Sequence, residues 1–329
     1  MTLYQRGDIY VAESSITVSR DATFTGNNNI FALLTTEPGI RTFDTISLAP
    51  LGHLTLTGTG IAGIALVSPI CAAVVYSGTS QVDIVNLSTL AKTNITTGAG
   101  TVFTNGSGQQ VAGNSGTGFA MSTSATTSVR LINANTQTLS TFSPSILTGT
   151  TPSCVGVKNS NFIVGTSNGK IFEITTTGGI VQSITLPTAN NVGTVVTPHV
   201  SGISYSGPNV ICVTNEGIGY VINWGASSIV SEFMCGDGST SASQAPVLCT
   251  ASGGITILGR TLGASNSGVN AIAEYYIAGN NFVCESIYYL EGSSSAGAIT
   301  GAGLDSYNNK AFIITADSSE ILRCRIFDV

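Results

Sequence analysis

The stretch Asn161-Phe-Ile-Val-Gly-Thr-Ser-Asn-Gly-Lys-Ile-Phe-Glu-Ile174 contains two apolar segments on either side of a Ser-Asn-Gly turn. Asn-Gly between apolar segments is a strong signal for a β-hairpin. A short segment with small residues, Cys154-Val-Gly156, precedes this hairpin, and a more polar segment, Val181-Gln-Ser-Ile184, follows it. This order predicts a four-stranded unit with a closely packed inner strand and a water-facing outer strand.

The same order of segments recurs along the whole chain. The steps between equivalent apolar strands run from 43 to 57 residues, with the strands centred on Phe31, Val74, Phe119, Phe162, Ile211, Ile255 and Phe312. Four-stranded propeller repeats have a period of roughly 40–50 residues. The longest step contains the Gly/Ser/Asn-rich insertion Gly263-Ala-Ser-Asn-Ser-Gly268. The sequence therefore predicts seven blades.

The two ends of the chain complement each other. After the seventh hairpin the sequence ends at Val329, one strand short of a blade, whereas Asp8-Ile-Tyr-Val11 is a spare strand ahead of the first blade. We expect an all-β, seven-bladed β-propeller whose ring is closed by the N-terminal strand joining the last blade. It is predicted to be a single domain over residues 1–329, with blades at roughly 14–57, 58–97, 98–142, 143–188, 189–234, 235–290 and 291–329 plus 1–13.

Two of the hairpin units carry a resemblance to known propellers. The phrases Gln81-Val-Asp-Ile-Val-Asn-Leu87 and Asn168-Gly-Lys-Ile-Phe-Glu-Ile174 resemble the second-to-third strand units of YVTN-type and quinoprotein-like seven-bladed propellers. The resemblance covers nearly the whole chain as a pattern. It departs from WD-repeat proteins, because no Trp-Asp pair occurs and Trp224 is followed by Gly225.

The composition is unusually poor in charge. Charged residues make up 9% and hydrophobic residues 42%, with a net charge of −6, whereas soluble domains carry roughly 25% charged residues. The basic residues are scattered, so the basic stripe that nucleic-acid binding needs is not expected. The N-terminus lacks a signal-peptide pattern. The most apolar stretch, residues 61–76, is interrupted and too short for a membrane span. We expect a protein made in the cytoplasm.

The cysteines are spread thinly and form no Cys-x-x-Cys pair, which zinc and redox sites favour. Several lie in apolar strands, where a thiol acts as a small hydrophobic group. We expect reduced structural thiols, with a disulfide as the alternative, at Cys71, Cys154, Cys212, Cys235, Cys249, Cys284 and Cys324.

Candidate catalytic residues are few. His53 and His199 are the only histidines, and each is expected to be structural rather than a general base or metal ligand. A lactonase-like propeller would hold Ca²⁺ with carboxylates near strand ends, for which the candidates are Glu37, Glu216, Asp305 and Asp317. These residues share no register that aims them at one axis, and turn chemistry accounts for Glu216 and Asp317. The prediction is a non-enzyme with no catalytic, cofactor-binding or metal-binding residues.

The neutral polar composition, rich in Thr, Ser, Asn and Gly, resembles that of bacteriophage tail, neck and fibre proteins. Weak polar contacts would hold such a protein in an assembly, where a free protein relies on charge for solubility. We therefore expect a non-enzymatic virion component that docks neighbouring subunits or a host receptor or glycan. The alternatives are an extracellular or cell-surface binding module, such as a glycan binder, and a Ca²⁺-dependent lactonase-like enzyme.

Overall fold

The computed structural model describes fifteen stretches of the chain, and every structural statement below concerns these residues: 4–12, 21–25, 29–35, 39–56, 61–76, 79–96, 110–188, 197–234, 247–250, 255–262, 269–278, 281–289, 296–305, 310–317 and 321–328. Apart from the short 3-10 helix η1 (Ser145–Leu147), the regular structure in these residues consists of antiparallel strands. The predicted Gly263–Gly268 insertion lies outside the described residues. The expected all-β class is confirmed.

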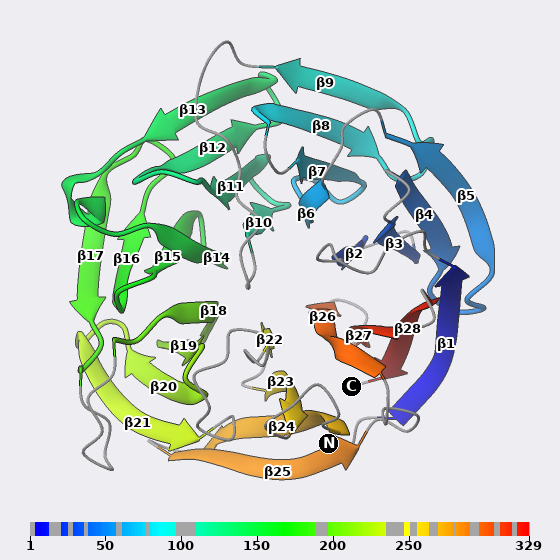
Figure 1. Ribbon diagram of the computed structural model, residues 1–329. Coiled ribbons are helices and arrows are strands. Elements are labelled where there is room, and N and C mark those ends of the chain that lie inside the picture. Colours follow the sequence, from blue (N-terminus) through cyan, green and yellow to red (C-terminus); the bar gives the residue numbers. More distant parts are fainter. Residues whose placement is uncertain are drawn as a thin grey trace.

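The strands form seven four-stranded sheets arranged as blades around a central axis (Figure 1). Blade 1 consists of β2(Ala22–Phe24), β3(Ile30–Thr35), β4(Gly39–Asp44) and β5(Pro50–Thr55). Blade 2 consists of β6(Ile61–Leu66), β7(Cys71–Tyr76), β8(Gln81–Asn86) and β9(Lys92–Thr96). Blade 3 consists of β10(Val111–Asn114), β11(Phe119–Thr123), β12(Val129–Asn133) and β13(Thr138–Phe142). Blades 4 and 5 are β14(Pro152–Lys158), β15(Asn161–Thr166), β16(Lys170–Ile174), β17(Ile180–Thr185); and β18(Val200–Ser206), β19(Asn209–Thr214), β20(Ile218–Asn223), β21(Ser228–Met234). Blade 6 is β22(Val247–Thr250), β23(Ile255–Leu262), β24(Val269–Ala278), β25(Asn281–Tyr289), and blade 7 combines β26(Ala296–Asp305), β27(Lys310–Asp317) and β28(Ile321–Asp328) with β1(Tyr4–Ala12).

The N-terminal strand closes the ring, as predicted. β1 pairs antiparallel with β28, from Tyr4 opposite Asp328 to Ala12 opposite Ile321, and becomes the outer strand of blade 7 (Figure 1). The inner strands contact one another in the order β2, β6, β10, β14, β18, β22 and β26, and β26 returns to β2. Because the ring has no open end, the sheet of each blade lies between two neighbouring blades.

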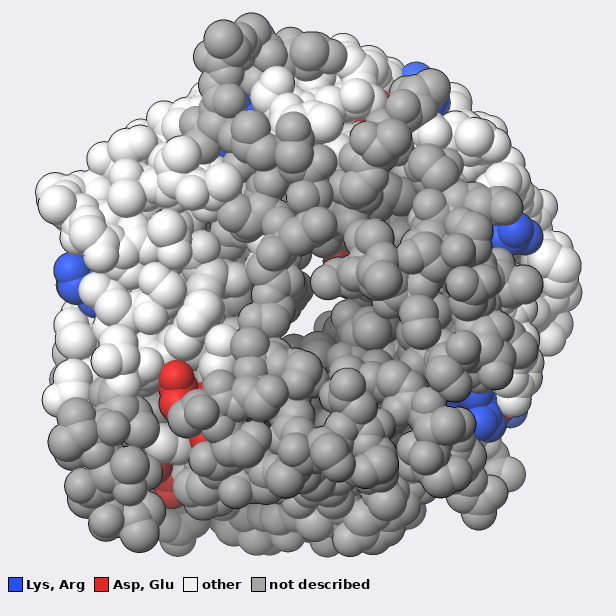
Figure 2. All heavy atoms as spheres, viewed as in Figure 1, with Lys and Arg blue, Asp and Glu red and all other residues white. Residues whose placement is uncertain are grey.

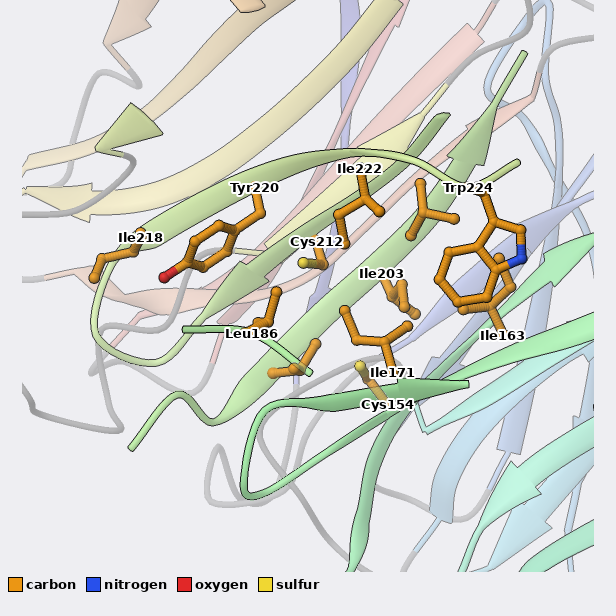
Figure 3. Packing of buried hydrophobic residues seen from close by; sticks show 12 residues of the cluster. Cys154, Ile163, Ile171, Leu186, Ile203, Cys212, Ile218, Tyr220, Ile222 and Trp224 are labelled. Atoms are coloured by element: carbon orange, nitrogen blue, oxygen red, sulfur yellow. The ribbon is translucent and has the colours of Figure 1, made fainter. Parts of the chain in front are cut away.

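Hydrophobic cores fill the spaces between adjacent blades. Between blades 7 and 1, the rings of Phe24, Phe31 and Phe312 meet with centroids 5.0 to 5.6 Å apart. Between blades 4 and 5, aliphatic side chains of facing strands surround the two thiols of Cys154 and Cys212 (Figure 3). A blade thus buries its apolar face only against its neighbours, which is why the repeat must be built as a ring.

The described cysteines behave as core residues. Cys71, Cys154 and Cys324 carry free thiols. Burial raises the pKa of Cys154 to about 12, so this thiol stays protonated at neutral pH. No helix in the described part of the chain is long and apolar enough to cross a membrane.

Turns of one kind join the third strand to the fourth in blades 1 to 5. A side chain at the end of the third strand accepts hydrogen bonds from backbone amides two to four residues later, as Asp44, Asn86, Asn133, Thr175 and Asn223 do. A residue with positive φ then ends each turn: Leu48, Leu90, Gln137, Gly178 and Ser227. Such side-chain caps fix the backbone of the turn. We call the surface formed by residues 44–48, 86–90, 133–137, 175–179 and 223–227 the turn face.

Candidate functional site

The inner strands begin on the face of the ring opposite the turn face, and we call this second face the entrance face. Four residues hold equivalent places at these starts, since the carbonyl oxygen of each accepts a hydrogen bond from the end of the second strand. The residues are Asp21, Gln110, Thr151 and His199. In the space-filling view an opening runs through the centre of the ring (Figure 2). The strand starts therefore border a polar entrance to a central channel.

Asp21 links the inner strands of blades 1 and 2. Its carboxylate accepts hydrogen bonds from the backbone amides of Ala22 (2.9 Å) and Ile64 (3.0 Å). A Cβ atom added at Gly63 would lie 3.2 Å from Asp21 Oδ2, so the glycine makes room for this contact. Burial raises the pKa of Asp21 to about 7 although both amides lower it. Asp21 therefore changes charge near neutral pH.

Side chains continue these links through blades 3 to 5. Gln110 Oε1 accepts from Thr123 Oγ1 at 3.0 Å, while its Nε2 donates to the Ser153 carbonyl at 3.2 Å. The Ser153 hydroxyl in turn donates to the carbonyl of Val200. Blades 1 and 2, 3 and 4, and 4 and 5 are thus each joined at the entrance by a side chain that bonds to the neighbour's backbone.

His199 and Glu216 lie together at the entrance side of blade 5. The His199 backbone amide points at the Glu216 carboxylate, with its nitrogen 3.4 Å from Oε1 and 3.3 Å from Oε2. Glu216 sits in the tight turn between β19 and β20, which Gly217 permits with a φ of 75°. Burial lowers the pKa of the His199 imidazole, although the nearby Glu216 charge raises it.

The structure separates most of the sequence-predicted site residues. His53 is exposed on β5, the outer strand of blade 1, far from the axis in Figure 1. Asp305 ends the inner strand β26 on the turn-face side, whereas Asp317 pairs with Ala296 at the entrance side. Glu37 lies outside the described residues. Of the six candidates, His199 and Glu216 alone are brought together by the described residues.

Among the described residues, no group of three or more His, Cys, Asp or Glu side chains is placed to hold a metal ion. The entrance instead offers hydrogen-bond acceptors and hydroxyls. Sequence reasoning missed Asp21, Gln110 and Ser153. The one available signal was that each lies at or just before the start of an inner strand that contains small residues. Their residue types differ from blade to blade, so no repeated motif marks them.

Comparison with known proteins supports the fold. No protein-family model matches the sequence, and no curated protein matches it. Among solved structures, the chain is similar to the β-propeller domain of Myceliophteria thermophila Cps50 (Swd1), with a TM-score of 0.68, 10% sequence identity, and coverage of 100% of both chains. At this identity the likeness concerns the fold alone. The chain is a β-propeller.

Proposed function

We propose that this protein is a non-enzymatic interaction module, and specifically a bacteriophage virion component that docks neighbouring subunits or the host surface. The observation that carries the proposal is the turn face. Of the residues in its five turns, Asp44 alone is charged. Its carboxylate accepts hydrogen bonds from the backbone amides of Ile46 and Ser47. The exposed side chains there are mostly hydroxyls and amides, as at Ser88, Thr89, Asn135 and Thr136.

A rigid, neutral surface suits docking for two physical reasons. Capped turns have little conformational freedom left to lose when a partner binds. Hydroxyl and amide groups also form hydrogen bonds without the desolvation cost of a charge. Figure 2 shows the same scarcity of charge elsewhere, since most described surface atoms there belong to uncharged residues.

The scarcity of exposed aromatic rings favours a protein partner over a glycan. Among the residues whose side-chain exposure the structure describes, Tyr10 is the one aromatic among the exposed large hydrophobic side chains, and it lies on β1 at the outer rim. Sugar-binding surfaces commonly stack the ring of the sugar on an aromatic face, which the turn face does not offer.

Mass spectrometry of purified particles from the source tests the proposal. We expect the protein among their structural components, and its absence from intact particles contradicts the virion role. Two charge-introducing variants on the turn face, Ser88→Lys and Thr136→Lys, are expected to reduce incorporation. The matched control is Thr93→Lys on the exposed outer strand β9. Equal incorporation of all three variants and the wild type contradicts docking through the turn face.

A further inference from the structure

Several of the few described basic side chains are already committed to partners within the ring. Lys158 pairs with Glu173, Lys310 with Asp328 and Arg323 with Asp8, and Lys170 donates to the carbonyl of Ile146. In the view of Figure 2 the blue atoms lie toward the outer rim, whereas red atoms are visible in the wall of the opening and over β18 to β21. At the entrance, a positive group of a partner therefore meets little repulsion from these basic side chains.

Glu216 keeps unused acceptor capacity. Both of its carboxylate oxygens share one donor, the backbone amide of His199, at 3.3 and 3.4 Å. An ionised carboxylate has about four lone-pair sites. The remaining sites of Glu216 are not taken by any other described group, and the side chain is partly exposed.

Asn215, the neighbour of Glu216, supplies the second observation. Its side chain is 9% exposed, and no donor among the described residues reaches its amide oxygen. Its backbone amide donates to the carbonyl of His199 at 2.9 Å, so Asn215 and His199 are cross-strand neighbours at the start of the inner strand. A buried acceptor without a donor is costly in a folded protein, and an incoming donor removes that cost.

We propose that the entrance beside blade 5 receives a cationic side chain of a partner protein, a lysine ammonium or an arginine guanidinium, with Glu216 and Asn215 as its acceptors. Both cations carry several donors and no acceptor, which complements the carboxylate and the amide oxygen of two consecutive residues. This inference rests on the proposed function as an interaction module and adds the chemistry of the partner.

His199 favours the same ligand. Because burial lowers its pKa, the imidazole is neutral at pH 7 and adds no positive charge beside Glu216. On acidification the protonated imidazole would occupy the carboxylate and repel a cation. Binding is therefore expected to weaken below the pKa of His199.

Fluorescence anisotropy with a fluorescein-labelled hexalysine peptide at low salt tests the site on the full chain. We expect the wild type to bind the peptide and Glu216→Gln, which keeps the shape of the side chain, to bind it about fivefold more weakly. Asn215→Ala should also weaken binding. The control Glu232→Gln removes an equal charge from the outer strand β21 and should leave affinity unchanged. A hexaglutamate peptide should not bind.

The inference is overturned if the wild type does not bind hexalysine, or if Glu216→Gln binds it as tightly as the wild type does. Equal losses in Glu216→Gln and Glu232→Gln would show general charge attraction and also overturn it. The test is separate from that of the virion role. If the protein is found in particles but Glu216→Gln leaves peptide binding unchanged, the cation site alone is wrong. If the peptide result holds but the protein is absent from particles, the virion role alone is wrong.

Discussion

Replacing Glu173 by alanine removes the centre of a polar network that joins blades 4 and 5. Glu173 is 2% exposed, and its carboxylate accepts hydrogen bonds from Lys158 Nζ (3.1 Å), Asn161 Nδ2 (2.6 Å) and Trp224 Nε1 (2.7 Å). The first two donors belong to blade 4, whereas Trp224 follows β20 of blade 5. The substitution leaves an ammonium and a buried indole N–H without their acceptor.

The magnitude follows from the burial of these donors. Removing one partner of a buried ion pair costs roughly 3–5 kcal/mol. The Lys158 side chain is 17% exposed and regains some water, so we expect the lower end, a loss of about 3 kcal/mol in the free energy of unfolding. With an unfolding entropy of roughly 2.1 cal/mol/K per residue over the whole chain, this corresponds to a fall of about 4 °C in Tm.

The assay is thermal and urea unfolding followed by circular dichroism, with the fluorescence of Trp224 as a local probe, since it is the single tryptophan. The control is Lys92→Ala, an exposed position on β9, which should change Tm by less than the error. A double-mutant cycle with Trp224→Phe isolates the indole bond, for which we expect a coupling of about 1.5 kcal/mol. If Glu173→Ala unfolds within about 1 kcal/mol of the wild type, the network does not hold the two blades together.

The same network has a pH dependence of defined sign. Burial raises the pKa of Glu173, but the hydrogen bonds from Asn161, Lys158 and Trp224 together with the Lys158 charge outweigh it and lower the pKa below the ordinary value of 4.5. The contribution of Glu173 is therefore present above the unfolded-state pKa and lost as the pH falls through the folded-state value. In Glu173→Ala this part of the acid loss of stability should disappear.

Two further substitutions and one deletion test other parts of the ring. The pKa of Asp21, about 7, lies above its unfolded value of 3.8, so the folded state binds the proton more tightly. The Tm of the wild type should therefore rise as the pH falls from 8 to 5, and Asp21→Asn should flatten this dependence of Tm on pH. Gln137 is exposed with a φ of 54°, and Gln137→Gly should raise the unfolding free energy by about 1 kcal/mol; a lower Tm would refute strain at this turn. Deleting residues 1–12 removes β1, and we expect a poorly folded chain that exposes the core around Cys324; a native-like, cooperative unfolding transition would contradict closure by this strand.

The sequence could predict the features that repeat. Alternating apolar segments around turns such as Ser167-Asn-Gly169 follow from local chemistry, so the seven sheets and the closing role of β1 could be found without a structure. The turn caps could also be found, since Asp, Asn and Thr stand at the ends of third strands for the same local reason. These features depend on neighbours in the sequence.

The links between blades could not be predicted, because their partners lie some 40 residues or more apart and differ in type. Asp21 bonds to a backbone amide of blade 2, Gln110 to a carbonyl of blade 4, and Trp224 to the carboxylate of Glu173. These junctions use different residue types, so no repeated motif reveals the pairs. His199 and Glu216 were both candidates, but their pairing within blade 5 depends on where the turn between β19 and β20 places Glu216, which the sequence does not show.

The scarcity of charge has a structural explanation. Several of the few charged side chains are buried inside blades or at the ring closure, namely Asp83, Arg130, Glu173, Lys310 and Arg325. Asp83, for example, accepts hydrogen bonds from Tyr76 at 2.6 Å and Asn94 at 2.7 Å within blade 2. Charges used in this way strengthen the ring but give the surface little of the repulsion that keeps free proteins apart. A protein built like this gains from being covered by partners, which links the internal use of charge to the neutral turn face.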